Sequence, residues 1–172
     1  MTQTKFVEFG ESSFWAYDVA AGVFLKYLID AAQASAQADP TWLLKAIESW
    51  RVQACITEFG FHLDKNWSSA QRQTFIALAE EACSRLAPRK AIPAEEIVGW
   101  KFVDDLYVHP RGAKEVETAP VIELGRAIIA LVSGQLPRPP EGKVWFYGTP
   151  AGRETIGWTK QKVRKGGPLA EC

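Results

Sequence analysis

The sequence predicts an α+β fold that is mainly helical, with four to five helices and a small antiparallel sheet built on a C-terminal β-hairpin. Apolar residues recur at helical spacing in several segments between residues 12 and 134, and residues 144–158 carry the aromatic, glycine and proline pattern of a hairpin. The chain has 172 residues, 47% of them hydrophobic and 23% charged, which is typical of one domain. We therefore expect a single globular domain over residues 1–165 and a flexible C-terminal tail over residues 166–172.

The first predicted helix begins at Ser12 or Ser13, runs to Gln37 and is apolar on nearly every side. A helix that is hydrophobic all round is usually the central one, covered by its neighbours. Asp18 is the polar exception near its start. The Asp18 carboxylate either faces solvent on a narrow strip of the N-terminal half or has a function.

The second and third predicted helices have clear start signals. Asp39 is a good N-cap with Pro40 in the first turn, and Ser68 with Gln71 has the pattern of a capping box. Residues 58–60 stop the second helix. Each helix has one apolar stripe at helical spacing, which we expect to be buried: Leu43, Ile47, Trp50 and Ala54 in the second, and Phe75, Leu78, Ala79, Ala82 and Leu86 in the third.

The region between the third and the last helix is less regular. A short helix is expected at Pro93, and residues 106–108 are expected to be extended, which makes them the obvious candidate for a third strand beside the hairpin. The last helix starts near Thr118, which is suited to be its N-cap, and ends at Gly134.

The segment Thr149-Pro150-Ala151-Gly152 fits a type I turn that ends in a glycine bulge, which is a three-residue hairpin loop. With Thr149 opposite Arg153, alternation separates two faces of the hairpin. One face is apolar and suited to pack on the helices: Val144, Phe146, Ile156 and Trp158. The other face is either a second packing layer or an exposed recognition patch: Trp145, Tyr147, Arg153 and Thr155.

Composition argues against several classes of function. Twenty basic and twenty acidic residues leave a formal net charge of zero, so a nucleic-acid partner is not expected. The basic residues 160–165 either contact nucleic-acid phosphates or an acidic partner or, as we expect, form a solvated tail. The N-terminus lacks a signal-peptide pattern and no apolar run is long enough for a bilayer, so we expect a soluble, cytoplasmic protein with no membrane partner. Three cysteines without a CxxC spacing and two histidines predict neither a disulfide framework nor a metal site.

Catalytic motifs are equally scarce. The chain has no GxSxG, GxxxxGK[ST] or GxGxxG, so no nucleophile elbow, phosphate loop or cofactor is predicted, and no segment resembles the motif of a characterised family. One polar group has catalytic residue types, because its acids and imidazole suit acid–base work on an anionic substrate: Asp104, Asp105, His109 and Arg111. The alternative is a solvated loop, since adjacent acids point in different directions.

Two classes of function remain open. The first is a non-enzymatic protein-binding domain, such as an immunity-type or inhibitor protein that occludes a toxin or an enzyme. Its binding residues would be those of the aromatic hairpin face, because Trp, Tyr and Arg dominate interface hot spots: Trp145, Tyr147, Arg153 and Thr155. Formation of a homodimer through the same face is a variant of this class. The second class is a small enzyme or ligand-binding protein without a recognisable motif, which would use residues 104–111 or Asp18. We favour the first class.

Overall fold

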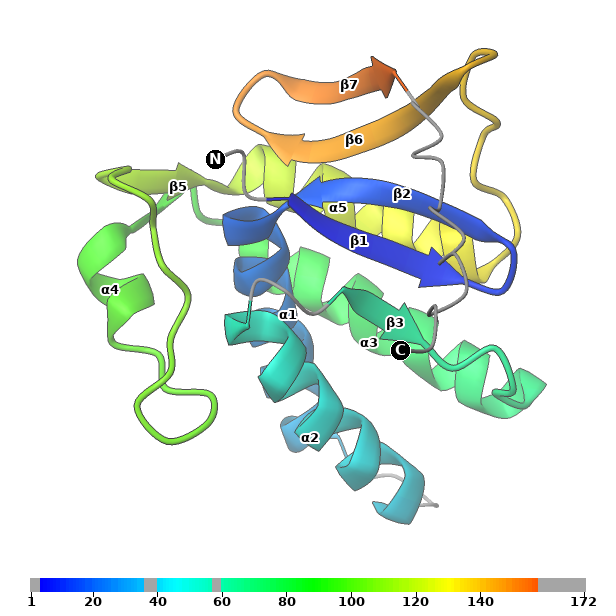
Figure 1. The fold of residues 1–172 in the computed structure, drawn as a ribbon. Helices are drawn as coiled ribbons and strands as arrows, with labels where there is room; N and C mark the ends of the chain where they lie inside the picture. Colours follow the sequence, from blue (N-terminus) through cyan, green and yellow to red (C-terminus); the bar gives the residue numbers. More distant parts are fainter. Residues whose placement is uncertain (1–3, 36–39, 57–59, 158–172) are drawn as a thin grey trace, which may run out of the picture.

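The structure of the protein, a computed structural model, describes residues 4–35, 40–56 and 60–157. In these ranges the chain forms a single α+β domain, as predicted, with five helices and seven strands (Figure 1). The predicted tail over residues 166–172, the predicted N-cap Asp39 and the hairpin residue Trp158 lie outside the described residues.

Five strands form one mixed sheet in the order β3-β1-β2-β6-β7. Their bounds are β1 (Thr4–Phe9), β2 (Ser12–Tyr17), β3 (Phe61–Leu63), β6 (Lys143–Thr149) and β7 (Gly152–Gly157). β1 and β2 pair antiparallel, as do β6 and β7, whereas β3 on β1 and β6 on β2 are parallel. A separate antiparallel pair joins β4 (Ala91–Pro93) to β5 (Glu115–Glu117). The strand beside the C-terminal hairpin is therefore β2, and the prediction that residues 106–108 would supply it is wrong.

The N-terminal hairpin also differs from the prediction. The predicted helix start at Ser12 or Ser13 is wrong, because both residues lie in β2. Its two-residue loop places Gly10, with φ of 62°, at the first central position, which is where a type II′ hairpin turn takes glycine. β1 and β2 carry apolar residues on both faces, so alternation is hidden and the run resembles an all-round apolar helix.

Helix α1 (Asp18–Ala34) is the central helix, as predicted, although it begins at Asp18. It contacts α2 (Pro40–Cys55), α3 (Ser69–Leu86) and α5 (Thr118–Val132), and most of its residues are buried. The described helix ends at Ala34 with Ser35 as its C-cap, and the predicted end at Gln37 lies outside the described residues.

Helices α2 and α3 confirm the predicted elements. The Gln71 amide donates to the Ser68 hydroxyl at 3.2 Å and the Ser68 amide donates to the Gln71 side chain at 2.8 Å, so the capping box is formed. The predicted apolar stripes of both helices are buried throughout. Trp50 of α2 and Phe61 of β3 both contact the ring of Phe75 of α3.

The segment between α3 and α5 is partly as predicted. The short helix α4 (Ala94–Val98) follows Pro93, as expected. Leu106, by contrast, makes only an isolated bridge to Val103, and Val108 packs against α1 so closely that a Cβ on Gly22 would lie 2.5 Å from it. Packing against α1, and not strand pairing, therefore decides the conformation of residues 106–108.

The start of α5 differs from the prediction, because Glu117 occupies the N-cap position and no side chain caps this end. Thr118 lies inside the helix, where its backbone N–H donates to the Lys90 carbonyl at 3.0 Å and its hydroxyl donates to the same oxygen at 3.1 Å. Pro120 has no N–H to satisfy, so the first turn needs little capping. The helix ends before Gly134, as predicted, with φ of 70° at that glycine.

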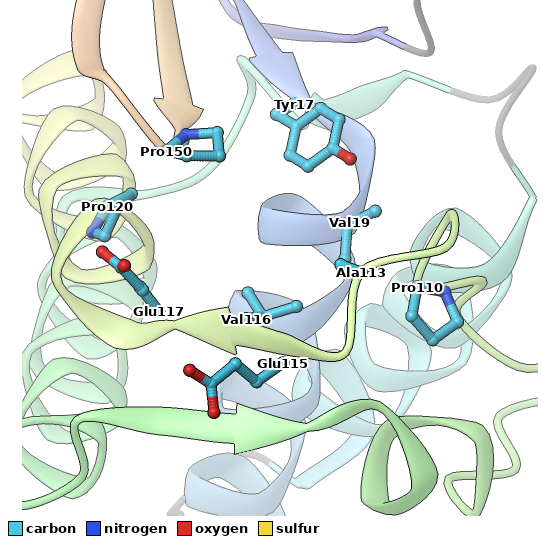
Figure 2. A pocket seen from close by; sticks show the side chains of 10 residues that line it. Tyr17, Val19, Pro110, Ala113, Glu115, Val116, Glu117, Pro120 and Pro150 are labelled. Atoms are coloured by element: carbon cyan, nitrogen blue, oxygen red, sulfur yellow. The ribbon is translucent and has the colours of Figure 1, made fainter.

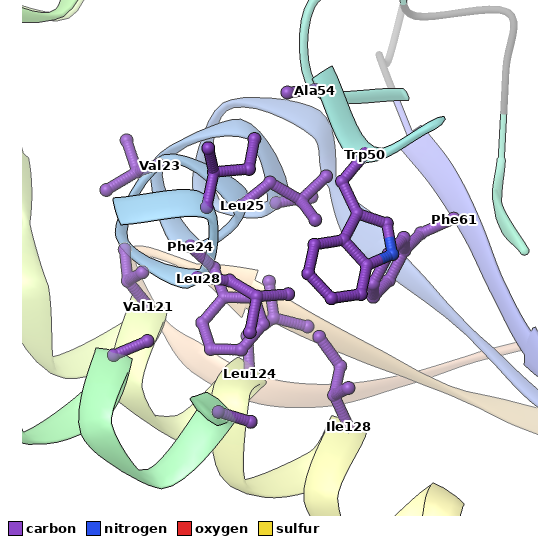
Figure 3. Packing of buried hydrophobic residues seen from close by; sticks show 14 of the residues in the cluster. Val23, Phe24, Leu25, Leu28, Trp50, Ala54, Phe61, Val121, Leu124 and Ile128 are labelled. Carbon is purple, nitrogen blue, oxygen red and sulfur yellow. The ribbon is translucent and has the colours of Figure 1, made fainter. Parts of the chain in front are cut away.

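The hydrophobic core lies between the inner face of the sheet and the helices (Figure 3). Phe24 and Leu28 of α1 lie against Leu124 and Ile128 of α5 in this view. Gly125 of α5 approaches the Phe24 ring so closely that a Cβ would lie 2.6 Å from it. No helix in the described ranges is long and apolar enough to cross a bilayer.

The C-terminal hairpin forms as predicted but with a different loop and register. Thr149 pairs with Gly152, and not with Arg153, which leaves a two-residue loop. The ladder is irregular just before the loop, where Gly148 has φ of 81° and a Cβ would lie 2.7 Å from Ala20 of α1. Only a glycine permits this close approach to α1, and its positive φ accommodates the irregularity in the ladder.

The hairpin face that packs on the helices is the opposite of the predicted one. Tyr147 belongs to the core, is 4% exposed and contacts the ring of Phe14 at 5.0 Å between centroids. Trp145 is half-buried against the same core. Phe146 lies on the other face, beside Trp15 of β2. The physical reason is that β2 pairs with β6 and so orients the hairpin. The sequence predicts a helix over residues 12–17, and a helix there offers no such pairing.

One ion pair joins the chain after α3 to α4. Arg89 donates two hydrogen bonds of 2.6 Å to the two carboxylate oxygens of Glu96, and these bonds lower the pKa of Glu96. Because that pKa is lower in the folded than in the unfolded state, the pair stabilises the fold above the ordinary carboxyl pKa. The stabilisation is lost as the pH falls through the lowered pKa.

Glu96→Gln is expected to lower the free energy of unfolding by about 1 kcal/mol near pH 7, since the pair is partly exposed. The difference from the wild type should shrink as the pH falls below the ordinary carboxyl pKa and through the lowered pKa of Glu96. Urea denaturation over a series of pH values measures it. Glu95→Gln is the matched control, because Glu95 is exposed in the same helical turn. A difference that persists unchanged at low pH would assign the effect to packing instead of charge.

Candidate functional site

A partly buried ion pair joins the start of α1 to the loop before β5. Arg111 donates from Nη2 to Asp18 Oδ2 at 2.9 Å and from Nε to the same oxygen at 3.3 Å. The Asp18 side chain is 7% exposed and that of Arg111 28%, so Asp18 does not face solvent on a helix strip. Asp18 Oδ1 accepts from the Val19 amide at 2.8 Å. Arg111 has φ of 58°, which non-glycine residues rarely adopt, so strained backbone delivers the guanidinium to this carboxylate.

A second buried charge lies nearby. Lys5 is 1% exposed and its Nζ donates to the Ile56 carbonyl at 2.9 Å, just beyond the C-terminus of α2, where a helix end favours a cation. Lys5, Asp18, His109 and Arg111 all line one cavity of about 10 Å³. That volume holds about one water molecule. The cavity is too small for an organic substrate, and these charges instead connect β1, α1, α2 and the loop before β5.

The structure only partly brings together the predicted catalytic group. His109 and Arg111 line the small cavity, and the His109 ring lies 4.5 Å from that of Tyr107. Asp105 is 92% exposed and pairs with Lys101 at 2.7 Å, and Asp104 is exposed in a turn with φ of 50°. Neither acid lines the cavity. Catalysis by the four residues together stays a prediction, and the positions of the two acids give it no support.

The described residues give little support to thiol or metal chemistry. Burial raises the pKa of the Cys55 and Cys83 thiols, so both stay protonated at neutral pH and are poor nucleophiles. No group of three or more His, Cys, Asp and Glu side chains in the described ranges is placed to hold a metal ion.

The four predicted binding residues lie on the hairpin side that faces α5. Burial raises the pKa of Tyr147, against the opposing effect of the nearby Arg153 guanidinium. Trp145 donates from Nε1 to the Pro137 carbonyl at 2.7 Å, and the exposed Arg153 lies 4.8 Å from the centroid of its ring. Thr155 is half-buried. Their role in binding a partner stays a prediction, since core packing already accounts for Trp145 and Tyr147.

The opposite face of the five-stranded sheet is covered by no described helix, because α5 crosses behind β1, β2 and β6 (Figure 1). We call this the outer sheet face. It carries a row of three aromatic side chains, Phe6, Trp15 and Phe146, across β1, β2 and β6. The rings of Phe6 and Trp15 lie 5.0 Å apart and both residues are half-buried, whereas Phe146 is 8% exposed.

Acids lie on both sides of this aromatic row. Glu8 of β1 contacts His62 of β3 at 2.7 Å, and both side chains are about half exposed. Glu154 of β7 lies opposite Phe146 and is exposed. The outer sheet face is thus an aromatic centre with an acidic border.

No protein-family model, no curated protein and no solved structure matches this chain.

Sequence reasoning missed the outer sheet face because it took residues 12–17 as helix. A usable signal was present: Gly10 lies between two short runs rich in β-favouring residues, which is the pattern of a hairpin. The buried Lys5 had no comparable signal, since its partner carbonyl at Ile56 is distant in sequence.

Proposed function

We propose that this protein is a protein-binding domain and that the outer sheet face binds its partner. The observation that carries the proposal is the row of Phe6, Trp15 and Phe146 on a sheet face that no described helix covers. Phe6 and Trp15 stay partly accessible on this face, and large aromatic side chains are the residue type that dominates interface hot spots. An immunity-type or inhibitor protein, which occludes a toxin or an enzyme, is a function that suits such a face.

The border of the outer sheet face indicates the chemistry of the partner. Glu8 and Glu154 make the border acidic, so a partner with an apolar patch edged by Lys and Arg side chains is electrostatically complementary. A homodimer through this face would bring the acids of two copies together. A basic partner is therefore favoured over a second copy of this chain.

The alternative of a small enzyme or ligand-binding protein has weaker support. Its candidates Asp104, Asp105, His109 and Arg111 share no arrangement that would receive a substrate, and the cavity beside His109 and Arg111 holds about one water molecule.

Site-specific photo-crosslinking in the native cells tests the proposed face. With p-benzoylphenylalanine in place of Ser13, on the outer sheet face, we expect one or a few discrete adducts with another protein. The matched control places the same group at Leu44, which is 60% exposed on α2. The proposal would be contradicted by equal adducts from both positions or by no adduct from position 13. An adduct with the mass of two copies would instead indicate a homodimer.

Charge reversal then tests the partner's chemistry. Glu154→Lys is expected to weaken binding of the crosslinked partner roughly tenfold or more, because it replaces attraction by repulsion at the border. Trp15→Ala should weaken it by roughly thirtyfold, as for a hot-spot residue. Glu141→Lys, an exposed position outside the face, is the control. Calorimetry measures the affinities, and equal affinities for all three variants would exclude this face.

A further inference from the structure

A pocket of about 160 Å³ lies beyond the end of β2, where several segments meet (Figure 2). Its lining comes from the start of α1, the loop before β5, β5 itself, the first turn of α5 and the turn between β6 and β7. Most of the lining is apolar, and three of the residues are prolines: Val19, Pro110, Val116, Pro120 and Pro150. The volume is roughly ten times the space that one water molecule needs, so it admits a group the size of a side chain.

Three polar side chains interrupt these apolar walls: Tyr17, Glu115 and Glu117. Figure 2 shows Tyr17 across the pocket from Val116, and Glu117 beside Pro120. Among the described residues, neither glutamate side chain has an ion pair or a hydrogen-bond partner, unlike the acids that pair with Arg89 or Arg111. Of the residues that the structure describes, no Lys or Arg lines the pocket. The pocket is therefore apolar with a negative border.

Backbone restrictions and close contacts constrain the walls of the pocket. Each proline has a fixed φ, and Gly148, which also lines the pocket, lies so close to α1 that a Cβ would be 2.7 Å from Ala20. Arg111, beside the lining residue Pro110, is held on Asp18 at 2.9 Å. A ligand would meet a preformed surface, which limits the conformational entropy lost on binding.

We propose that this pocket binds a basic side chain of another polypeptide. Its aliphatic stem would lie against Val19, Val116 and the prolines, and its cationic end would meet the Glu117 carboxylate, with Glu115 adding negative charge at the border. This inference goes beyond the proposed function, because it depends on the pocket alone and does not require the outer sheet face.

An NMR titration of the full chain tests this site with two probes that differ in charge. Nα-acetyl-lysine methylamide carries the stem and the ammonium group, and Nα-acetyl-norleucine methylamide carries a similar stem without charge. We expect the lysine probe to bind at least threefold more tightly and to shift the backbone amides of Ala113, Val116 and Gly148. Glu117→Gln should weaken the lysine probe at least threefold and leave the norleucine probe unchanged, and Glu141→Gln should affect neither.

Three results would overturn the inference: equal affinities of the two probes, an unchanged affinity of Glu117→Gln for the lysine probe, or chemical-shift changes spread over amides near acidic residues elsewhere in the protein. Because Glu117 also begins α5, Glu115→Gln is a second variant that leaves the helix start intact. It should weaken the lysine probe about twofold, and it decides the question if Glu117→Gln does not fold. A failure here leaves the crosslinking at position 13 unaffected, so the two proposals fail separately.

Discussion

Tyr147→Ala is expected to lower the free energy of unfolding by about 3–5 kcal/mol, the cost of removing a large buried aromatic side chain. Tyr147 is 4% exposed and its ring contacts that of Phe14 at the centre of the sheet. Its removal leaves a cavity between β6 and the helices. Urea denaturation measures the loss.

Two controls separate packing from recognition at this position. Tyr147→Phe keeps the ring and should cost only about 1 kcal/mol. Val144→Ala, at a half-buried position on the opposite side of β6, should cost about as little. If Tyr147→Ala left stability intact but abolished binding of the crosslinked partner, Tyr147 would belong to a recognition patch and its placement in the core would be wrong.

Arg111→Ala is expected to lower the free energy of unfolding by about 3 kcal/mol, because it leaves the Asp18 carboxylate buried without its cation. The Asp18 side chain is 7% exposed beside its 28% exposed partner, so most of the carboxylate lies against protein in the folded chain. Arg138→Ala, at an exposed arginine, should change stability by less than about 0.5 kcal/mol. Thermal or urea denaturation of the two variants gives the comparison.

The double variant Asp18→Asn with Arg111→Ala tests the cause of this loss. It removes the buried charge together with its partner, so it should be more stable than Arg111→Ala alone. If the double variant were as unstable as the sum of its single variants, the contribution of Arg111 would come from packing of its stem. Either result bears on the enzyme alternative, which would need Arg111 for a substrate and not for stability.

The helices were the predictable part of the fold. The capping box of Ser68 and Gln71, the stripe through Trp50 and the stop at Gly134 all formed as the sequence indicated. These features depend on residues a few positions apart, so a local pattern contains the information they need. The predicted start of α1 was wrong for the same reason. β2 is apolar on both faces, so its local pattern lacks the alternation that would identify a strand.

The candidate sites were less predictable. Trp145 and Tyr147 were rightly grouped on one side of the hairpin, but which side faces the helices depends on β2 pairing with β6. His109 and Arg111 line one small cavity, whereas Asp104 and Asp105 do not. The pocket beside Tyr17 joins three stretches of the chain, residues 17–19, 110–120 and 148–150, and no local sequence pattern indicates it.

The sequence by itself determined the α+β class, four of the five helices within a few residues of their ends and the existence of the C-terminal hairpin, because each depends on short-range hydrogen bonds and periodicity. Only the tertiary structure decided the order of the sheet, the inward face of the hairpin and the partner of Asp18. That last contact spans 93 positions, and its strength depends on burial that the folded chain alone creates. The outer sheet face likewise exists only because strands from both ends of the chain pair in one sheet.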